Sequence, residues 1–164
     1  MALSQKQIEE ARKELDESQN PFFFFDDDQD GLCSFLQLYR YKGDGKGYIV
    51  KTVPKVSANF IERIHGDPDK IFILDLAEVE QEFIDAVKKP VIWIDHHGPY
   101  QRHNVKYYNP RVSESKDNFP TSYLCYQIAQ KDMWLAMIGC IADWHVPDFI
   151  DEFRKEYPDL IVKA

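Results

Sequence analysis

Several aspartates and two histidines of this sequence have types and spacings suited to holding metal ions. They lie in "DDDQDG" (Asp26–Gly31), in "LDLA" with Asp75 and in "IDHHG" (Ile94–Gly98). Carboxylates that converge on one point repel one another unless cations neutralise them. Hard divalent ions prefer oxygen ligands, and imidazoles widen the choice toward manganese. Two such ions close together form a site for phosphoryl transfer.

Three of these aspartates directly follow apolar runs that read as buried strands. "FFFF" is followed by Asp26, "IFIL" by Asp75 and "VIWI" by Asp95. In a parallel sheet the carboxyl ends of strands lie along one edge, where open α/β folds bind ligands. Aspartate is a poor strand former and is costly to bury unpaired, so three such endings indicate a shared task. Alternation also places Asp26, Asp28 and Asp30 on one side of an extended segment, whereas Asp27 faces solvent.

The surrounding sequence predicts the elements that would position these residues. We expect strands at 22–25, 48–54, 70–77 and 90–99, and helices at 4–17, 31–41, 57–66, 79–89, 121–130, 132–143 and 147–157. Apolar strands that alternate with amphipathic helices indicate a parallel sheet covered on both faces. The predicted fold is therefore α/β and doubly wound, with a mainly parallel sheet and a C-terminal helical portion. Thr121 and Ser122 are expected to cap the helix that they begin.

Composition limits the class of protein. At 164 residues, with 44% hydrophobic residues, the chain fits one globular domain: an N-terminal helix in 1–19, βα units in 20–99 and a helical portion in 120–157. A net charge of −8 argues against a broad basic face for nucleic acid. The sequence has neither a membrane-spanning run nor a secretory signal, and its three cysteines match no zinc pattern. These features predict reduced core thiols and a cytoplasmic location.

These three segments, together with "GCIADW" and its Asp143, resemble in order and spacing the four motifs of the DHH phosphoesterase superfamily, with Asp95-His96-His97 as its signature. The resemblance spans roughly residues 20–157 and is greatest to RecJ-like and archaeal members. It implies two divalent metal ions, usually Mn²⁺ with Mg²⁺ possible. One ion would be held by Asp26 and Asp28, the other by Asp30, His96 and Asp143, with Asp75 bridging them. Asp95 would orient a histidine, His97 would contact the scissile phosphate, and a metal-activated water would attack phosphorus.

The function that this resemblance implies is hydrolysis of phosphodiester bonds in single-stranded nucleic acid or short oligonucleotides. The alternatives are a small-molecule phosphohydrolase acting on pyrophosphate, polyphosphate or a cyclic dinucleotide, and a catalytically inactive scaffold. Family enzymes usually carry a C-terminal substrate-binding domain, and this sequence stops at Ala164. We therefore expect either a catalytic-domain fragment or a minimal protein whose cleft is completed by another domain or partner.

Three other interpretations of "DDDQDG" remain open on the residues alone. A calcium-binding loop fits Asp26, Asp28, Asp30 and Gly31, but its twelfth position is Gln37 and an aromatic strand precedes it. A haloacid-dehalogenase-type phosphatase would use the first aspartate as its nucleophile, yet Leu32 stands where its threonine is expected. The third interpretation is a solvated turn between a strand and a helix. None of the three accounts for the Asp-His-His triplet.

Overall fold

A computed structural model of the chain describes residues 2–51, 53, 55–113 and 118–160. Its main sheet has five strands in the order β2-β1-β4-β6-β7, and every neighbouring pair is parallel. The strands are β1 (Pro21–Asp26), β2 (Lys46–Val50), β4 (Lys70–Leu74), β6 (Val91–Ile94) and β7 (Val105–Tyr108). A second, small sheet pairs β3 (Lys55–Val56) with β5 (Glu78–Val79). The predicted α/β class and parallel sheet are confirmed.

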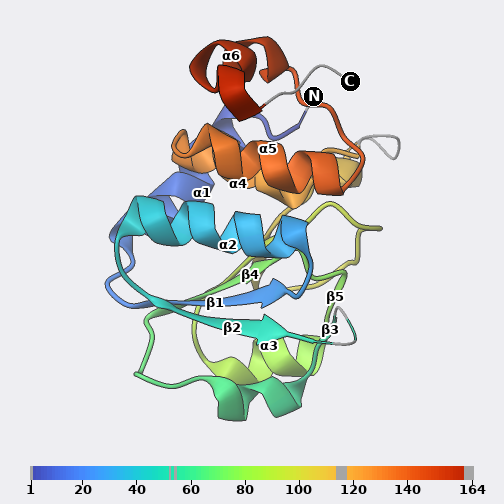
Figure 1. Cartoon of the computed structure of the whole chain (residues 1–164). Helices are drawn as coiled ribbons and strands as arrows, with labels where there is room; N and C mark the ends of the chain where they lie inside the picture. The colour runs from blue at the N-terminus through green and yellow to red at the C-terminus, as the bar shows by residue number, and fades with distance from the viewer. Residues whose placement is uncertain (1, 52, 54, 114–117, 161–164) are drawn as a thin grey trace.

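Helices cover both faces of the main sheet (Figure 1). On one face lie α1 (Gln5–Glu17), α2 (Gln29–Lys42) and α4 (Thr121–Ala129), with α5 (Met133–Ala142) packed across α2 and α4. On the other face lie α3 (Gln81–Val87) and the 3₁₀ helix η1 (Ala58–Arg63). The remaining elements are α6 (Ile150–Glu156), which packs on α5, and the single turns η2 (Pro110–Val112) and η3 (Pro158–Leu160). The doubly wound arrangement is thus confirmed.

The aromatic run before the aspartates forms the centre of the sheet. Phe23 and Phe25 pack into the core beneath α1, α2 and α4, while Phe22 and Phe24 pack into the core beneath α3 and η1. All four side chains are buried, as expected for a parallel strand that has helices on both faces. β1 can therefore hold its carboxyl end rigidly in place.

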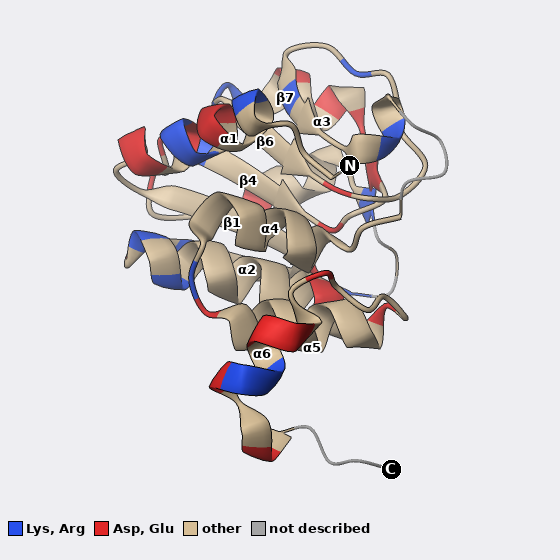
Figure 2. Cartoon of the chain, turned by 90° about the horizontal axis from the view of Figure 1, so that it is seen from above, with Lys and Arg blue, Asp and Glu red and all other residues tan. Residues whose placement is uncertain are grey.

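Charged residues are unevenly distributed over the helices. Figure 2 shows α1 striped with acidic and basic residues, whereas α4 and α5 contain none. Within the described residues, no helix is long and apolar enough to cross a membrane. The charged groups that do lie within the interior layers are therefore few, and most of them belong to the strand-end segments.

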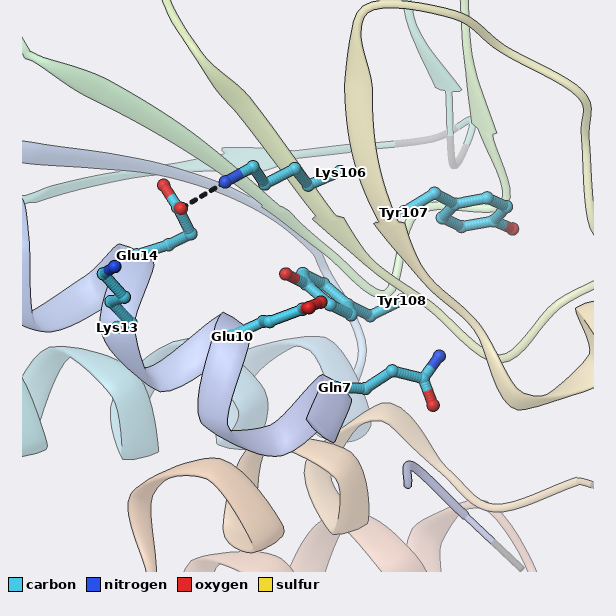
Figure 3. Close-up of a pocket in the computed structure, with 7 residues that line it drawn as sticks. All are labelled: Gln7, Glu10, Lys13, Glu14, Lys106, Tyr107 and Tyr108. Atoms are coloured by element: carbon cyan, nitrogen blue, oxygen red, sulfur yellow. Dashed lines mark hydrogen bonds and ion pairs between the residues drawn. The ribbon is translucent and has the colours of Figure 1, made fainter. Parts of the chain in front are cut away.

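The N-terminal helix is fixed at its start and along its length. Ser4 and Gln7 form a capping box at the start of α1, as the predicted helix start requires. Farther along, Glu14 is nearly buried and pairs with Lys70 of β4, at 2.8 Å, and with Lys106 of β7 (Figure 3). Burial opposes ionisation of Glu14, but these hydrogen bonds outweigh it and hold the pKa of Glu14 below its ordinary value. α1 is thus anchored across two strands.

Several elements differ from the sequence-based prediction. The helix expected at 57–66 is a 3₁₀ helix, and Ser57 makes no capping hydrogen bond. The strand expected at 48–54 ends at Val50, while residues 52 and 54 lie outside the described residues. Val79 belongs to β5 instead of the helix that follows it. The strand β7 was not predicted, because "VKYY" is short and the polar segment before it resembles a loop.

Candidate metal centre

The ends of four adjacent strands place a row of polar residues along one edge of the sheet. Phe25 pairs with Leu74, Leu74 with Ile94, and Ile94 with Tyr108. The row consists of the residues that follow these four, namely Asp26, Asp75, Asp95 and Asn109. The chain passes from β1 to β2 on one side and then to β4, β6 and β7 on the other. The row therefore lies at the topological switch point, where α/β folds bind ligands.

The candidate ligands approach one another in three overlapping groups, in each of which the ligand atoms lie within 4.8 Å of one another. The groups are Asp26, Asp28 and Asp75; Asp30, His96 and Asp143; and Asp75, His96 and His97. Nε2 of His96 lies 3.5 Å from Oδ1 of Asp75 and 3.7 Å from Oδ2 of Asp143. The structure thus brings all six predicted ligands together, and Asp75 lies between the two sets that the resemblance implies.

Asp75 is the most deeply buried of these carboxylates. Its side chain is 1% exposed, and its Oδ1 accepts a hydrogen bond of 2.9 Å from the Thr121 hydroxyl. Desolvation, and then the neighbouring charges of Asp30 and Asp28, raise the pKa of Asp75 well above its ordinary value. Its backbone adopts the left-handed conformation, with φ at 59°, which aspartate and asparagine tolerate better than most residues.

Asp30 is tied to the first turn of α4. Its two carboxylate oxygens accept hydrogen bonds from the backbone N–H groups of Thr121, at 2.7 Å, and Ser122, at 2.9 Å. The prediction that Thr121 and Ser122 form an N-cap pair is wrong, because Pro120 occupies the cap position and both residues lie inside the helix. Thr121 instead connects α4 to Asp75, so the helix start orients two carboxylates of the candidate site.

Asp26 and Asp28 lie at the junction between β1 and α2. Asp28 is the N-cap of α2 and accepts a hydrogen bond of 2.9 Å from the Gly31 N–H. Oδ1 of Asp26 accepts one of 2.8 Å from the Asp27 N–H, and burial raises the pKa of Asp26. Asp27 is exposed, but the predicted extended segment through Asp30 is wrong, because β1 ends at Asp26 and Asp30 lies in the first turn of α2. Each of the two candidate ligands is therefore held by a local backbone contact.

The calcium-loop interpretation does not fit this arrangement. Residues 22–25 are strand, and α2 runs without interruption from Gln29 to Lys42. Gln37 is buried within that helix, where its side chain donates a hydrogen bond of 2.9 Å to the Ser122 carbonyl. The twelfth position of the supposed loop therefore packs between helices, away from any ion held by Asp26 and Asp28.

Asp95 and His97 form a hydrogen-bonded pair beside the candidate ligands. Nδ1 of His97 lies 2.7 Å from Oδ1 of Asp95, which is fully buried. This hydrogen bond raises the pKa of His97 above its ordinary value, against the effect of burial. Sequence reasoning missed two residues that also bind Asp95, Tyr107 and Asn109. The signal that could have found them is the aromatic run "VKYY" followed directly by Asn-Pro.

Three free thiols surround Asp30 in the helix layer. Cys33, Cys125 and Cys140 are all buried and form no disulfide. Burial, and then the nearby charge of Asp30, raise the pKa of Cys33 to about 11 and that of Cys140 to about 12. The same two causes raise the pKa of Cys125 well above its ordinary value. The thiols are therefore neutral core groups at physiological pH.

Gly31 allows α2 to begin directly against the end of β1. A Cβ at this position would lie 2.6 Å from the Asp26 carbonyl oxygen and 2.8 Å from the Asp26 nitrogen, both of which are backbone atoms that cannot turn aside. We expect Gly31→Ala to lower the free energy of unfolding by about 1–3 kcal/mol and to weaken manganese binding, because it separates Asp26 from Asp28 and Asp30.

Urea denaturation and manganese calorimetry would measure both effects. Gly98→Ala is the matched control, since a Cβ there meets nothing within 4 Å, and its free energy of unfolding should change by less than about 0.5 kcal/mol. Equal stability of the two variants would contradict the close packing described for Gly31.

Comparison with known structures finds proteins of the same fold. RecJ from Thermus thermophilus, in complex with Mn²⁺, matches with 19% identity and a TM-score of 0.66, over 88% of this chain and 25% of its own. An exonuclease RecJ bound to manganese matches with 19% identity and a TM-score of 0.66, over 86% of this chain and 44% of its own.

A third match is a DHH domain described as that of a member of a family of ribosomal proteins. It has 14% identity and a TM-score of 0.71, over 96% of this chain and 50% of the matched one. The chain thus spans between a quarter and a half of the length of these proteins. No curated protein matches the sequence.

A family model assigns the sequence independently of these structures. The model of the DHH family, N-terminal domain, matches residues 22–145, which run from the second residue of β1 to beyond α5 and include every candidate ligand. The strand-end aspartates and the Asp-His-His triplet described above all lie within that match. The chain therefore belongs to the DHH family.

Proposed function

We propose that the chain is a metal-dependent phosphoesterase that hydrolyses phosphodiester bonds of single-stranded nucleic acid or short oligonucleotides. The observation that carries this proposal is the gathering of Asp26, Asp28, Asp30, Asp75, His96 and Asp143 around the switch point of the sheet. Among the described residues, no lysine or arginine forms an ion pair with any of these carboxylates. Divalent cations would neutralise the mutual repulsion of these carboxylates.

The donor set fits two such ions. Asp26 and Asp28 would hold one, Asp30, His96 and Asp143 the other, and Asp75 would contact both. Nε2 of His96 lies 3.5 Å from Asp75 and 3.7 Å from Asp143, so this ring nitrogen faces the carboxylates and would be the nitrogen donor. Carboxylates combined with imidazole suit Mn²⁺, with Mg²⁺ as a second choice, and the two RecJ structures hold manganese. When bound, the ions would supply charge for the phosphate oxygens and lower the pKa of a water nucleophile.

His97 and Asp95 would serve the phosphate group itself. Because Nδ1 of His97 donates to Asp95, its Nε2 is left for a phosphate oxygen or for a proton passed to the leaving group. The imidazole is partly exposed, so a substrate can reach it. Asp95 would keep the ring in one orientation and would stabilise its protonated form as charge develops.

The surface beside the candidate ligands favours a substrate with bases. Trp144 directly follows Asp143, and its side chain is 97% exposed. An aromatic ring that contributes so little to the core is available to stack on a nucleobase, a contact worth about 1–3 kcal/mol. One of the matched structures is described as an exonuclease. The free buried thiols support a cytoplasmic location as part of the same proposal.

The experiment that tests the proposal compares three substrates in the presence of Mn²⁺. We expect release of mononucleotides from a short single strand, with pyrophosphate and a cyclic dinucleotide left intact, and no release when the metal is chelated. Trp144→Ala should raise the KM for the oligonucleotide about 5- to 150-fold and leave hydrolysis of a phosphodiester that lacks bases unchanged. Cleavage of pyrophosphate alone would support the small-molecule alternative, and tight manganese binding without any hydrolysis would support a scaffold.

A further inference from the structure

The carboxylate of Asp95 is surrounded by hydrogen-bond donors from two neighbouring strand ends. Oδ1 accepts from Nδ1 of His97, and Oδ2 lies 3.1 Å from the His97 backbone nitrogen. Oδ2 also lies 3.2 Å from the Tyr107 hydroxyl and 3.1 Å from Nδ2 of Asn109. Within the described residues no lysine or arginine pairs with Asp95. The buried carboxyl group of Asp95 is therefore held by donors from His97, Tyr107 and Asn109, three of which share Oδ2.

Asn109 has only one amide orientation that satisfies its neighbours. Its Oδ1 accepts a hydrogen bond of 2.8 Å from the Arg111 N–H, so its Nδ2 must face Asp95. That nitrogen also lies 2.7 Å from the Tyr107 oxygen and 3.0 Å from the His97 carbonyl oxygen. Asn109 thus contacts Asp95 itself, the Tyr107 hydroxyl and the backbone of His97.

Tyr107 presents its hydroxyl to Asp95 from a ring that is already fixed. The ring stacks on Trp93 of β6, with the centroids 4.0 Å apart and the planes 17° from parallel. Burial raises the pKa of Tyr107, so the phenol stays protonated and can donate. Both Tyr107 and Asn109 come from the end of β7, the edge strand on this side of the sheet.

We infer that Tyr107 and Asn109 are positioning residues, which hold Asp95 in place and through it fix the tautomer and orientation of His97. A proton on Nδ1 of His97, directed at Asp95, leaves Nε2 facing the substrate phosphate. The inference rests on the proposed function, in which His97 contacts that phosphate. The edge strand β7 would thus hold the reacting histidine in position.

Two adjacent tyrosines allow a matched test. Tyr107→Phe removes the hydroxyl that binds Asp95 and keeps the ring on Trp93. Tyr108→Phe removes a hydroxyl from the next residue, whose buried ring is turned toward α1, on the opposite side of the strand from Tyr107 (Figure 3). Asn109→Asp replaces the donating amide with a carboxylate of similar shape, beside Asp95.

For Tyr107→Phe we expect kcat for the oligonucleotide to fall about 10- to 100-fold, with KM and manganese affinity within about 2-fold of wild type. Asn109→Asp should lower kcat further, and Tyr108→Phe should leave it unchanged. In ¹⁵N NMR of the magnesium-loaded protein, at a pH high enough for His97 to be neutral, His97 should be the Nδ1–H tautomer in wild type and Tyr108→Phe, and a mixture of tautomers in Tyr107→Phe. The His97 resonance is assigned by its loss in His97→Gln.

An unchanged His97 tautomer and unchanged kcat in Tyr107→Phe would overturn the inference. So would equal losses of kcat in Tyr107→Phe and Tyr108→Phe, because those would indicate packing alone. If wild-type protein hydrolyses none of the substrates, the proposed function fails, while the NMR comparison still decides whether Tyr107 positions His97.

Discussion

Asp75→Asn is expected to abolish tight manganese binding and to lower hydrolysis by more than about 1,000-fold, while the metal-free protein becomes no less stable. Loss of one preorganised contact to a transition state typically costs about 100- to 1,000-fold, and loss of an ion removes several such contacts. Asparagine accepts the left-handed backbone of Asp75 and can still bind the Thr121 hydroxyl. It also replaces a buried carboxyl group whose ionisation the metal-free fold opposes, as the raised pKa of Asp75 indicates.

Calorimetric titration with Mn²⁺ and thermal unfolding in a chelator would measure the two effects on the same preparation. Asp69→Asn is the control, because it should change the stability of the protein and leave its manganese affinity unchanged. Asp69 accepts hydrogen bonds from the Ser18 hydroxyl, at 2.6 Å, and from the backbone N–H groups of Gln19 and Asn20. Its replacement should lower the free energy of unfolding by about 1–3 kcal/mol and leave manganese affinity unchanged. A destabilised Asp75→Asn protein would show that Asp75 serves the fold more than the ion.

Manganese is expected to stabilise the folded protein by a large amount. At a free concentration 100 times its Kd, an ion that binds only the folded state adds about 2.7 kcal/mol to the free energy of unfolding. For a chain of this length that corresponds to a rise in Tm of about 5–11 °C per ion. The physical reason is that the cation removes the mutual repulsion of carboxylates that the fold holds within 4.8 Å of one another.

Burial of these carboxyl groups gives the metal-free protein a defined pH dependence. The pKa values of Asp26, Asp30 and Asp75 are raised by burial, so the folded state binds more protons than the unfolded state above the ordinary carboxyl range of about 4. Stability without metal should therefore fall as pH rises through that window. The raised pKa of His97 acts in the same direction near neutral pH.

Urea unfolding at a series of pH values, with chelator and with Mn²⁺, would reveal this slope and its removal. Asp75→Asn in chelator should show a shallower slope than wild type. A metal-free protein whose stability rises steadily with pH above about 5 would contradict the electrostatic description of the site.

The sequence predicted the class of fold and the convergence of its strand ends because these depend on simple regularities. Continuous apolar runs such as "FFFF" require burial on both faces, and parallel strands present their carboxyl ends at one edge. An aspartate at the end of each run could therefore be located from the order of residues alone. The ligand assignments themselves stay predictions, since geometry alone does not show that an ion binds.

What could not be predicted depends on contacts between distant segments. β7 has only four residues, one of them lysine, and its extended form is stabilised by pairing with β6. Asn109 and Tyr107 acquire their partners only when that pairing forms. The first turn of α4 looked like an ordinary helix start, because nothing near Thr121 in sequence indicates that Asp30, 91 residues away, accepts its N–H. Local capping rules cannot anticipate such an acceptor.

The three thiols of the helix layer have a consequence for how the protein can be damaged. Peroxide and alkylating reagents attack thiolates, and none of Cys33, Cys125 and Cys140 forms a thiolate readily while the fold is closed. Their oxidation is therefore governed by how often the layer of α2, α4 and α5 opens. Asp30 contributes to that layer and is a proposed metal ligand, so a bound cation would hold the layer closed and would thereby slow oxidation of the cysteines around it.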